Sequence, residues 1–334
     1  MSSASHWIEP HPTGIYVRPA DLWIDPSTPR SAALVTHGHA DHARGGHGKV
    51  WATPETLAIM ALRYGTAEEG VAVPYGEEIS IGGVKISFNP AGHVLGSAQI
   101  LLQHAGERIV VTGDYKRRLD PTCRPFEPIA CDVFITEATF GLPVFRHPSA
   151  AVEVSKLIEA RDKNPDRCVL VGAYALGKAQ RVIAELRAVG EDGPIYLHGA
   201  LQKMCTLYEA HGVALGDLRS ATDANTDDLR GAIVLAPPSA LNDRWARRLP
   251  DPITAMASGW MQVRQRARQR GVELPLIISD HADWDELTAT IRELRPTETW
   301  VTHGRSDALV HWCALNQLKA RALDLVGRED EEEA

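Results

Sequence analysis

The chain has 334 residues, of which 44% are hydrophobic and 23% charged, an ordinary composition for a globular protein long enough to form two cores. It contains no apolar run of about 18 residues, and its polar first twelve residues lack the apolar core of a secretory signal, so a membrane partner is not expected. Five cysteines without a C-x-x-C pair argue against disulfides and thiolate zinc fingers and predict a cytoplasmic location.

The net charge of −8 is unevenly distributed along the chain. Residues 328–334 carry five acids and one arginine, so they contribute −4 and predict a disordered acidic tail. Residues 243–271 carry seven arginines against two aspartates. This basic run predicts either a solvated helix face or a stripe that faces phosphate groups, and the two interpretations are equally supported.

Short apolar segments alternate with helical stretches, which predicts an α/β fold. The expected strands are 32–36, 84–89, 98–103, 108–112, 133–136, 168–172, 195–197, 232–236, 276–279 and 300–302. The expected helices include 54–64, 150–163, 177–189, 201–211, 259–269 and 283–294.

Six side chains that could take part in chemistry come directly after expected strands. They are His37, His93, Asp114, Glu137, His281 and His303. Because ligands in layered α/β folds bind at the carboxyl ends of strands, we expect these six residues to converge on one site.

The segment His37-Gly-His39-Ala-Asp41-His42 places four potential metal ligands within six residues. In an extended stretch, His37 and His39 point to the same side, and Asp41 and His42 can address a second point nearby. Imidazole and carboxylate groups suit zinc, manganese or iron. The alternative, that these are exposed polar loop residues, fits this spacing poorly. The segment therefore predicts a metal site.

Three further residues are expected to complete that site. The carboxylate of Asp114 could bridge two metal ions, while His93 could complete the first ion's ligands and His303 those of the second. Taken alone, a histidine in a loop is more often an ordinary polar residue. The position of each at a strand end favours the ligand role.

The order of Asp25, the motif His37 to His42, His93 and Asp114 resembles the metallo-β-lactamase superfamily. A second set, Glu137, His281 and His303, resembles the β-CASP branch of that superfamily, which processes nucleic acids. Residues 175–181, Ala-Leu-Gly-Lys-Ala-Gln-Arg, resemble the entry to the first β-CASP helix. Within the branch, the pattern and the short length are most similar to bacterial DNA ligase-associated exonucleases.

The resemblance implies an αββα sandwich whose chain is interrupted by a smaller α/β cap domain. The sandwich would comprise residues 1–142 and 274–334, and the β-CASP cap residues 143–273. Nucleic acid would bind in the cleft between the two domains.

On this basis we expect two divalent metal ions, both Zn²⁺, with Mn²⁺ as the alternative metal. The first would be held by His37, His39, His93 and Asp114, and the second by Asp41, His42, Asp114 and His303. Together the metals would activate water for attack on a phosphodiester, so Asp41 is both ligand and catalytic residue.

Two further roles are expected around the metals. The Glu137–His281 pair would protonate the leaving oxygen. Asp25 would accept a hydrogen bond from a ligand imidazole, and the alternative role for Asp25 is a plain turn cap at the end of a strand.

A weaker expectation concerns phosphate contacts. Lys178 and Arg181 stand at the start of an expected helix, where free N–H groups and cations attract phosphate. Three hydroxyl residues, Ser97, Ser279 and Thr302, could also donate to phosphate oxygens.

The resemblance favours a DNA exonuclease in DNA repair, directed to 5′ ends and associated with a DNA ligase and a helicase. The first alternative is an RNA nuclease of the RNase J or messenger 3′-end-processing kind. A small-molecule hydrolase is disfavoured because such an enzyme needs no cap of this size. An inactive binding module is disfavoured because every expected ligand is present.

Overall fold

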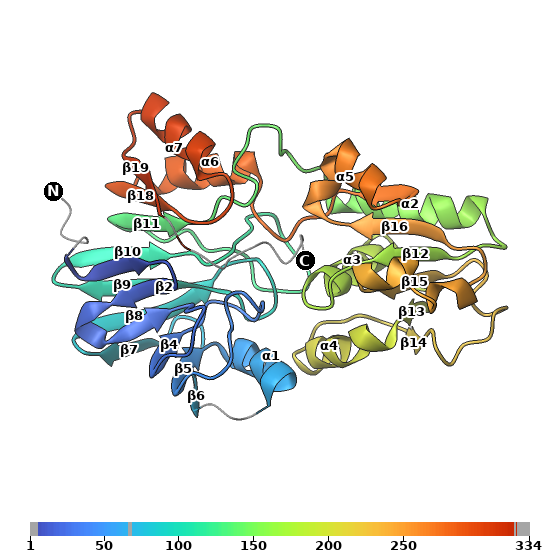
Figure 1. The fold of residues 1–334 in the computed structure, drawn as a ribbon, viewed down its shortest axis with the longest axis horizontal. Helices are drawn as coiled ribbons and strands as arrows, with labels where there is room; N and C mark the ends of the chain where they lie inside the picture. Colours follow the sequence, from blue (N-terminus) through green and yellow to red (C-terminus); the bar gives the residue numbers. More distant parts are fainter. Residues whose placement is uncertain (1–5, 66–68, 324, 326–334) are drawn as a thin grey trace. The chain divides into compact units, whose positions relative to one another are not determined.

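The computed structural model describes residues 6–65, 69–323 and 325 and confirms the α/β prediction (Figure 1). The chain divides into two compact units, one formed from 1–146 with 281–334 and the other from 147–280. The predicted acidic tail, 328–334, lies outside the described residues. Within the described residues, no helix has the length and apolar character needed to cross a bilayer.

The first unit contains a six-stranded sheet in the order β1-β2-β3-β4-β5-β6. The strands are β1 (Ile8–His11), β2 (Gly14–Val17), β3 (Leu22–Ile24), β4 (Ala32–Leu34), β5 (Lys49–Ala52) and β6 (Glu69–Ala72). Helix α1 (Pro54–Tyr64) packs on one face of this sheet through Leu57 and Met60. It begins where Thr53 accepts a hydrogen bond from the backbone N–H of Thr56, a standard N-cap.

A seven-stranded sheet in the order β19-β18-β11-β10-β9-β8-β7 completes the first unit. Its strands are β7 (Glu78–Ile81), β8 (Val84–Pro90), β9 (Ala98–His104), β10 (Glu107–Val111), β11 (Val133–Thr136), β18 (Glu298–Val301) and β19 (Ala320–Ala322). Strands β7 to β10 are antiparallel neighbours, whereas β10, β11, β18 and β19 run parallel. Two helices follow late in the chain, α6 (Trp284–Leu294) and α7 (Ser306–Leu315).

The two sheets of the first unit share one apolar core, and the alternation of side chains along β10 shows how. Ile109 and Val111 point into the core between the sheets, whereas Val110 points to the opposite face, where α6 and α7 pack. Each fully buried aliphatic side chain of this kind contributes about 1.5–3 kcal/mol. The first unit therefore consists of four layers, with helices outside two central sheets.

The second unit is built on an all-parallel six-stranded sheet in the order β14-β13-β15-β12-β16-β17. Its strands are β12 (Val169–Gly172), β13 (Ile195–Leu197), β14 (Leu218–Ser220), β15 (Ile233–Ala236), β16 (Ile253–Ala257) and β17 (Leu274–Leu276). Its helices are α2 (Ala150–Lys163), α3 (Lys178–Ala188), α4 (Gly199–Ala210) and α5 (Arg264–Gln269). Every residue of β12 and β15 is buried, as is typical of central parallel strands covered on both faces.

Two sequence predictions differ from the structure in this second unit. The strand expected at 276–279 is β17 at Leu274–Leu276, which pairs with β16. The helix expected at 259–269 is a 3₁₀ turn, Gly259–Gln262, followed by α5. The interruption falls at Val263, whose backbone is extended and whose β-branched side chain disfavours helix.

Several short elements are absent from the prediction. They are β1, β2, β3, β5, β6, β7, β14, β16, β19 and α7. Strands such as β6 and β7 have only four residues, and all of these residues are exposed or partly exposed. The sequence therefore shows no buried apolar periodicity that would identify them as strands.

Candidate metal centre

The histidine motif occupies a tight turn that follows β4. The backbone N–H groups of His42 and Ala43 both donate to the carbonyl of His39, at 3.1 Å and 2.7 Å. Gly38 lies against α1, because a Cβ atom there would stand 2.6 Å from Cγ2 of the buried Ile59. Helix α1 therefore packs directly against the turn that carries the predicted ligands.

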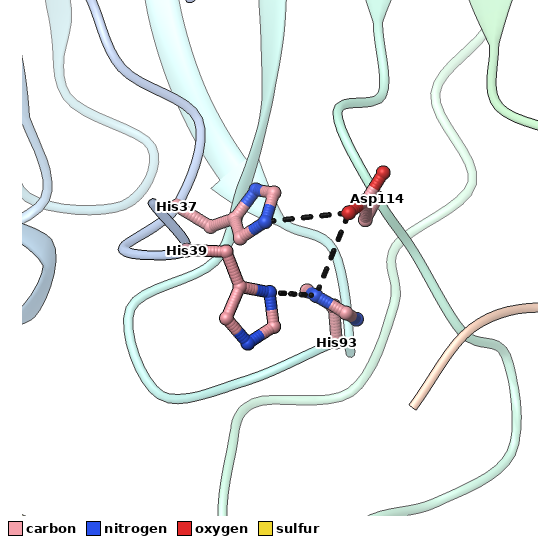
Figure 2. A group of neighbouring side chains, drawn as sticks. All are labelled: His37, His39, His93 and Asp114. Carbon is pink, nitrogen blue, oxygen red and sulfur yellow. Dashed lines mark hydrogen bonds and ion pairs between the residues drawn. The ribbon is translucent and has the colours of Figure 1, made fainter. Parts of the chain in front are cut away.

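One carboxylate oxygen lies at the centre of the site. Oδ2 of Asp114 lies 3.3 Å from Nε2 of His37, 3.4 Å from Nε2 of His42 and 3.7 Å from Nε2 of His93. Figure 2 shows three of the histidines with Asp114, and Nδ1 of His39 lies 2.9 Å from Nε2 of His93. His37, His39, His93 and Asp114 each offer one ligand atom within 4.8 Å of all the others.

The donor atoms of this cluster fit a bound cation. Nε2 of His37, Nε2 of His42 and Oδ1 of Asp41 are buried without a hydrogen-bond partner among the described residues. Buried polar atoms in that state cost about 1–3 kcal/mol each, and bound cations would supply the missing partners. Imidazole and carboxylate donors suit zinc and manganese. The cluster is therefore able to bind a metal ion.

Asp25 fixes the orientation of His42 directly and that of His37 through Thr36. Its Oδ2 lies 2.8 Å from Nδ1 of His42, and it accepts hydrogen bonds from the backbone N–H and the hydroxyl of Thr36 at 2.8 Å and 2.6 Å. Because the Thr36 hydroxyl donates to Asp25, it can accept from Nδ1 of His37, which lies 3.1 Å away. Both imidazoles therefore direct Nε2 toward Asp114, as expected for a carboxylate that supports metal ligands.

His303 lies at the margin of the cluster. Its ring centroid is 5.3 Å from that of His42, and its Nδ1 is 2.7 Å from the hydroxyl of Thr302. Its backbone has a φ of +55°, an uncommon conformation for a residue other than glycine. The structure thus brings His303 beside the predicted second ligand set.

The Glu137–His281 pair adjoins the same carboxylate. Nδ1 of His281 lies 3.0 Å and 3.2 Å from the two carboxylate oxygens of Glu137. Glu137 is completely buried and accepts from the backbone N–H of Tyr115 at 2.8 Å. Donor atoms of Asp114, Glu137 and His281 also lie within 4.8 Å of one another. The predicted acid–base pair and the predicted metal ligands therefore form one continuous polar cluster.

Burial and neighbouring charges shift the proton affinities of this cluster. Burial by itself lowers the pKa of His42, but the carboxylates of Asp114, Asp41 and Asp25 outweigh it and raise that pKa to about 9. Burial raises the pKa of Asp114 to about 6 despite the opposing charge of His42. Burial and the surrounding histidines hold the pKa of His37 well below its usual value. At neutral pH, His42 thus keeps a proton that a metal ion must displace.

Internal partners bind the residues of the second unit that were expected to contact phosphate. Lys178 and Arg181 do start α3, but both are buried, and both pair with Asp280. Ser279 is buried as well, and its carbonyl accepts from Arg181. The sequence places Lys178 and Arg181 at a helix start, which suggested a phosphate site. It does not show that the carboxylate of Asp280 pairs with both of them.

Ser97 and Thr302 also form internal hydrogen bonds. The hydroxyl of Ser97 accepts from the backbone N–H groups of His93 and Val94 at 3.1 Å and 3.2 Å, which closes the His93 turn. The hydroxyl of Thr302 donates to the carbonyl of Thr136 at 3.3 Å. Both residues shape the site and are buried.

Sequence reasoning missed supporting residues on two elements. Thr36, directly before the motif, links Asp25 to His37, and no sequence signal distinguishes it from an ordinary strand threonine. Asp283 and Glu286 cap α6 reciprocally, and this Asp-x-x-Glu spacing is a recognisable capping box. The cap residue Asp283 lies two residues after His281 and fixes the start of α6.

No family model matches the chain, but several known proteins are similar to it in sequence. The chain is 28% identical over 296 residues to a "Probable DNA ligase" of Opitutus terrae, across 87% of this chain and 28% of that protein. It is 24% identical over 388 residues to "Cleavage and polyadenylation specificity factor subunit 3-I" of Arabidopsis thaliana, across 91% and 55%. It is 31% identical over 260 residues to "Endoribonuclease YSH1" of Mycosarcoma maydis, across 63% and 29%.

These relatives confirm the resemblance stated from the motifs, namely to the β-CASP nucleases of the metallo-β-lactamase superfamily. The chain spans between about a quarter and just over half of the length of these three relatives.

Proposed function

We propose that this chain is a metal-dependent nuclease that hydrolyses phosphodiester bonds, with DNA ends as its substrate. The observation that carries the proposal is the convergence of three imidazole nitrogens on one oxygen of Asp114, with Glu137 and His281 beside it. The relatives support the reaction class, since one of them is named an endoribonuclease.

We further propose that the two units are the domains that the resemblance implies. The four-layered first unit would be the metallo-β-lactamase sandwich, and the parallel sheet of the second unit would be the β-CASP cap. The layer order of the first unit supports this assignment, since it matches the αββα arrangement expected of the sandwich. All the expected metal ligands belong to that unit.

The ligand roles follow the geometry around Asp114. His37, His39, His93 and Asp114 would hold one divalent ion, while Asp41, His42 and His303 would hold a second ion together with Asp114. When bound, such ions lower the pKa of water toward about 7 and neutralise charge on a phosphate, and Zn²⁺ suits this donor set best. Asp25 keeps His42 in the tautomer whose Nε2 can coordinate.

His281 would supply the proton that the leaving group needs. Its Nδ1 lies 3.0 Å from a carboxylate oxygen of Glu137, and we assign delivery of the proton to Nε2. As the bond between phosphorus and the sugar oxygen breaks, the proton on Nε2 passes to that oxygen. A buried carboxylate orients the imidazole and stabilises its charged form, as a general acid requires.

The assignment to DNA rests on the relative named a probable DNA ligase. About 296 residues of that protein align with 87% of this chain, while the chain spans only 28% of it. The alignment of this chain with part of a ligase-named protein supports a role beside a DNA ligase, with a helicase as the further expected partner.

Helix α5 offers a surface for the nucleic-acid backbone. Arg264, Arg268 and Arg270 are exposed, and none forms an ion pair within the described part of the chain. Arg266 stacks over the ring of Trp260 at 4.1 Å. Unpaired arginines in a chain of net charge −8 favour the phosphate-facing interpretation of residues 243–271.

End-labelled single strands of matched DNA and RNA sequence, incubated with protein of measured metal content, test the proposal. We expect metal-dependent shortening of DNA, and 5′-labelled and 3′-labelled strands will report the direction. The double variant Asp41→Ala/His42→Ala should lose cleavage and bound metal together, while His311→Ala on the exposed face of α7 should keep both. Full activity in the double variant would remove the proposed two-metal site.

An RNA-processing nuclease is the second candidate. The observation that favours it is that two relatives are named an endoribonuclease and a polyadenylation specificity factor subunit. In the same assay, RNA cleavage at a rate far above that on DNA would select this alternative.

A further inference from the structure

Side chains of α3 hold the backbone that follows β17. The carbonyl of Ile278 accepts a hydrogen bond from Nζ of Lys178 at 3.0 Å. The carbonyl of the next residue, Ser279, accepts from the guanidinium of Arg181. Two successive peptide groups beyond the end of the strand are thus bound by cations from the first turn of one helix.

The next residue along the chain completes this arrangement. Oδ2 of Asp280 lies 3.1 Å from Nζ of Lys178, and its Oδ1 lies 3.4 Å from the guanidinium of Arg181. From helix α2, the carboxylate of Glu153 accepts from the backbone N–H of Ile277 at 2.9 Å. Every residue from 277 to 280 is therefore bound by at least one side chain.

These charged groups are almost completely removed from water. Lys178 is 1% exposed, and Arg181 and Asp280 are each 4% exposed. A buried ion pair is weak evidence for stability, because desolvation offsets most of the attraction, whereas it does impose one geometry on the groups that form it. The chemistry of the cluster therefore favours a positioning role for these charges.

The segment so held leads directly into the site. The residue after Asp280 is His281, whose Nδ1 lies 3.0 Å from Glu137. Glu137 constrains the ring of His281, but the ring still moves if its backbone moves. The backbone on the N-terminal side of His281 is fixed by Lys178 and Arg181.

We propose that Lys178 and Arg181 are positioning residues for His281, and that they fix the backbone from which this proton donor extends. The inference rests on the proposed role of His281 as general acid. It assigns to two buried cations a function in proton delivery to the leaving group, without contact between either cation and the substrate.

Leaving-group dependence separates this role from a general structural role. An oligonucleotide needs a proton on its departing sugar oxygen, whereas the p-nitrophenyl ester of a nucleotide releases a phenolate that departs without one. We expect Lys178→Met to lower kcat on the oligonucleotide by about 10- to 100-fold, less than the roughly 10²- to 10⁴-fold contribution of a general acid itself. On the nitrophenyl ester, Lys178→Met and His281→Ala should each lower kcat by less than about threefold, because this leaving group needs no proton.

Arg187→Met provides the matched control. Arg187 also lies on α3 and also donates to backbone carbonyls, those of Leu215, Glu191 and Gly193, but these belong to other segments. It should lower both rates equally or not at all. If Lys178→Met fails to fold, Arg181→Lys, which keeps the charge, serves in the same comparison.

Each outcome of the comparison has a definite meaning. Equal losses on both substrates for Lys178→Met, or no loss on either, would overturn the positioning role. Equal losses for His281→Ala would instead overturn its role as general acid. In the double variant His281→Ala/Lys178→Met, we expect little loss beyond that of His281→Ala alone, because the two residues act through one proton.

Discussion

Nδ1 of His42 lies 2.8 Å from Oδ2 of Asp25, and Nε2 of the same ring lies 3.4 Å from Oδ2 of Asp114. One imidazole thus links a buried carboxylate behind the site to the carboxylate at its centre. The ring cannot rotate without breaking the hydrogen bond to Asp25. Several measurable consequences depend on this arrangement.

Asp25→Asn should weaken metal binding while leaving the fold intact. An amide can no longer stabilise the His42 tautomer as a carboxylate does, and loss of such a partner typically costs 10- to 100-fold in metal affinity. Competition with a chromophoric chelator measures the change. Asp21→Asn, at an exposed aspartate that binds the hydroxyl of Tyr16, is the control and should leave the affinity unchanged. Equal affinities in wild type and Asp25→Asn would mean that Asp25 is only a turn cap.

Metal affinity should rise with pH between about 7 and 8.5. In the metal-free protein, His42 carries a proton because its pKa is raised to about 9, and each metal ion bound there must release it. The apparent association constant should therefore increase about tenfold per pH unit, since one proton is displaced. The raised pKa of Asp114, about 6, and the lowered pKa of His37 place their proton changes below this window.

The stability of the metal-free protein should follow the opposite trend. A histidine whose pKa is raised on folding contributes stability that is fully present below its unfolded value of about 6.5 and is lost as pH rises toward 9. Thermal unfolding of chelator-treated protein, measured at intervals from pH 7 to 9, should show a falling midpoint. A midpoint that rises across this range would contradict the assigned charge state of His42.

Arg264→Gln, Arg268→Gln and Arg270→Gln combined should weaken nucleic-acid binding and reduce its salt dependence. Each phosphate contact that is lost lowers the slope of log affinity against log salt by about 0.7 for a single strand. Fluorescence anisotropy with labelled single-stranded DNA at several salt concentrations measures both effects. The control is Arg219→Gln with Arg230→Gln, since both of these exposed arginines already pair with aspartates. Unchanged slopes would favour the solvated-face interpretation of α5.

Gly38→Ala should destabilise the protein by about 1–3 kcal/mol, the usual cost of overpacking a core. The new methyl group would stand 2.6 Å from a buried atom of Ile59, so α1 or the histidine turn must shift, and metal affinity should fall as well. Urea unfolding and chelator competition measure the two effects. Gly199→Ala, which meets no atom within 4 Å, should be neutral. Unchanged stability of Gly38→Ala would contradict this prediction and show that α1 or the histidine turn can shift at little cost in free energy.

The sequence by itself determined which ligand-type residues form the candidate site. The spacing of His37, His39, Asp41 and His42 predicted a metal turn, and the placement of single polar residues after apolar strands predicted which distant residues would join it. Both predictions depend on local rules, because ligand type and strand-end position can be read without knowing how the strands are arranged. The α/β class followed from the same alternation of apolar segments.

Only the tertiary structure decided what the supporting polar residues do. Lys178 looked like a phosphate ligand at a helix start, yet its partner is Asp280, about 100 positions away in the sequence. Ser97 and Thr302 likewise bind internal groups that no local pattern identifies. A polar side chain takes whichever partner folding brings within reach once water is excluded. The identity of a residue fixes which hydrogen bonds it can donate or accept, and the long-range packing fixes which groups become its partners.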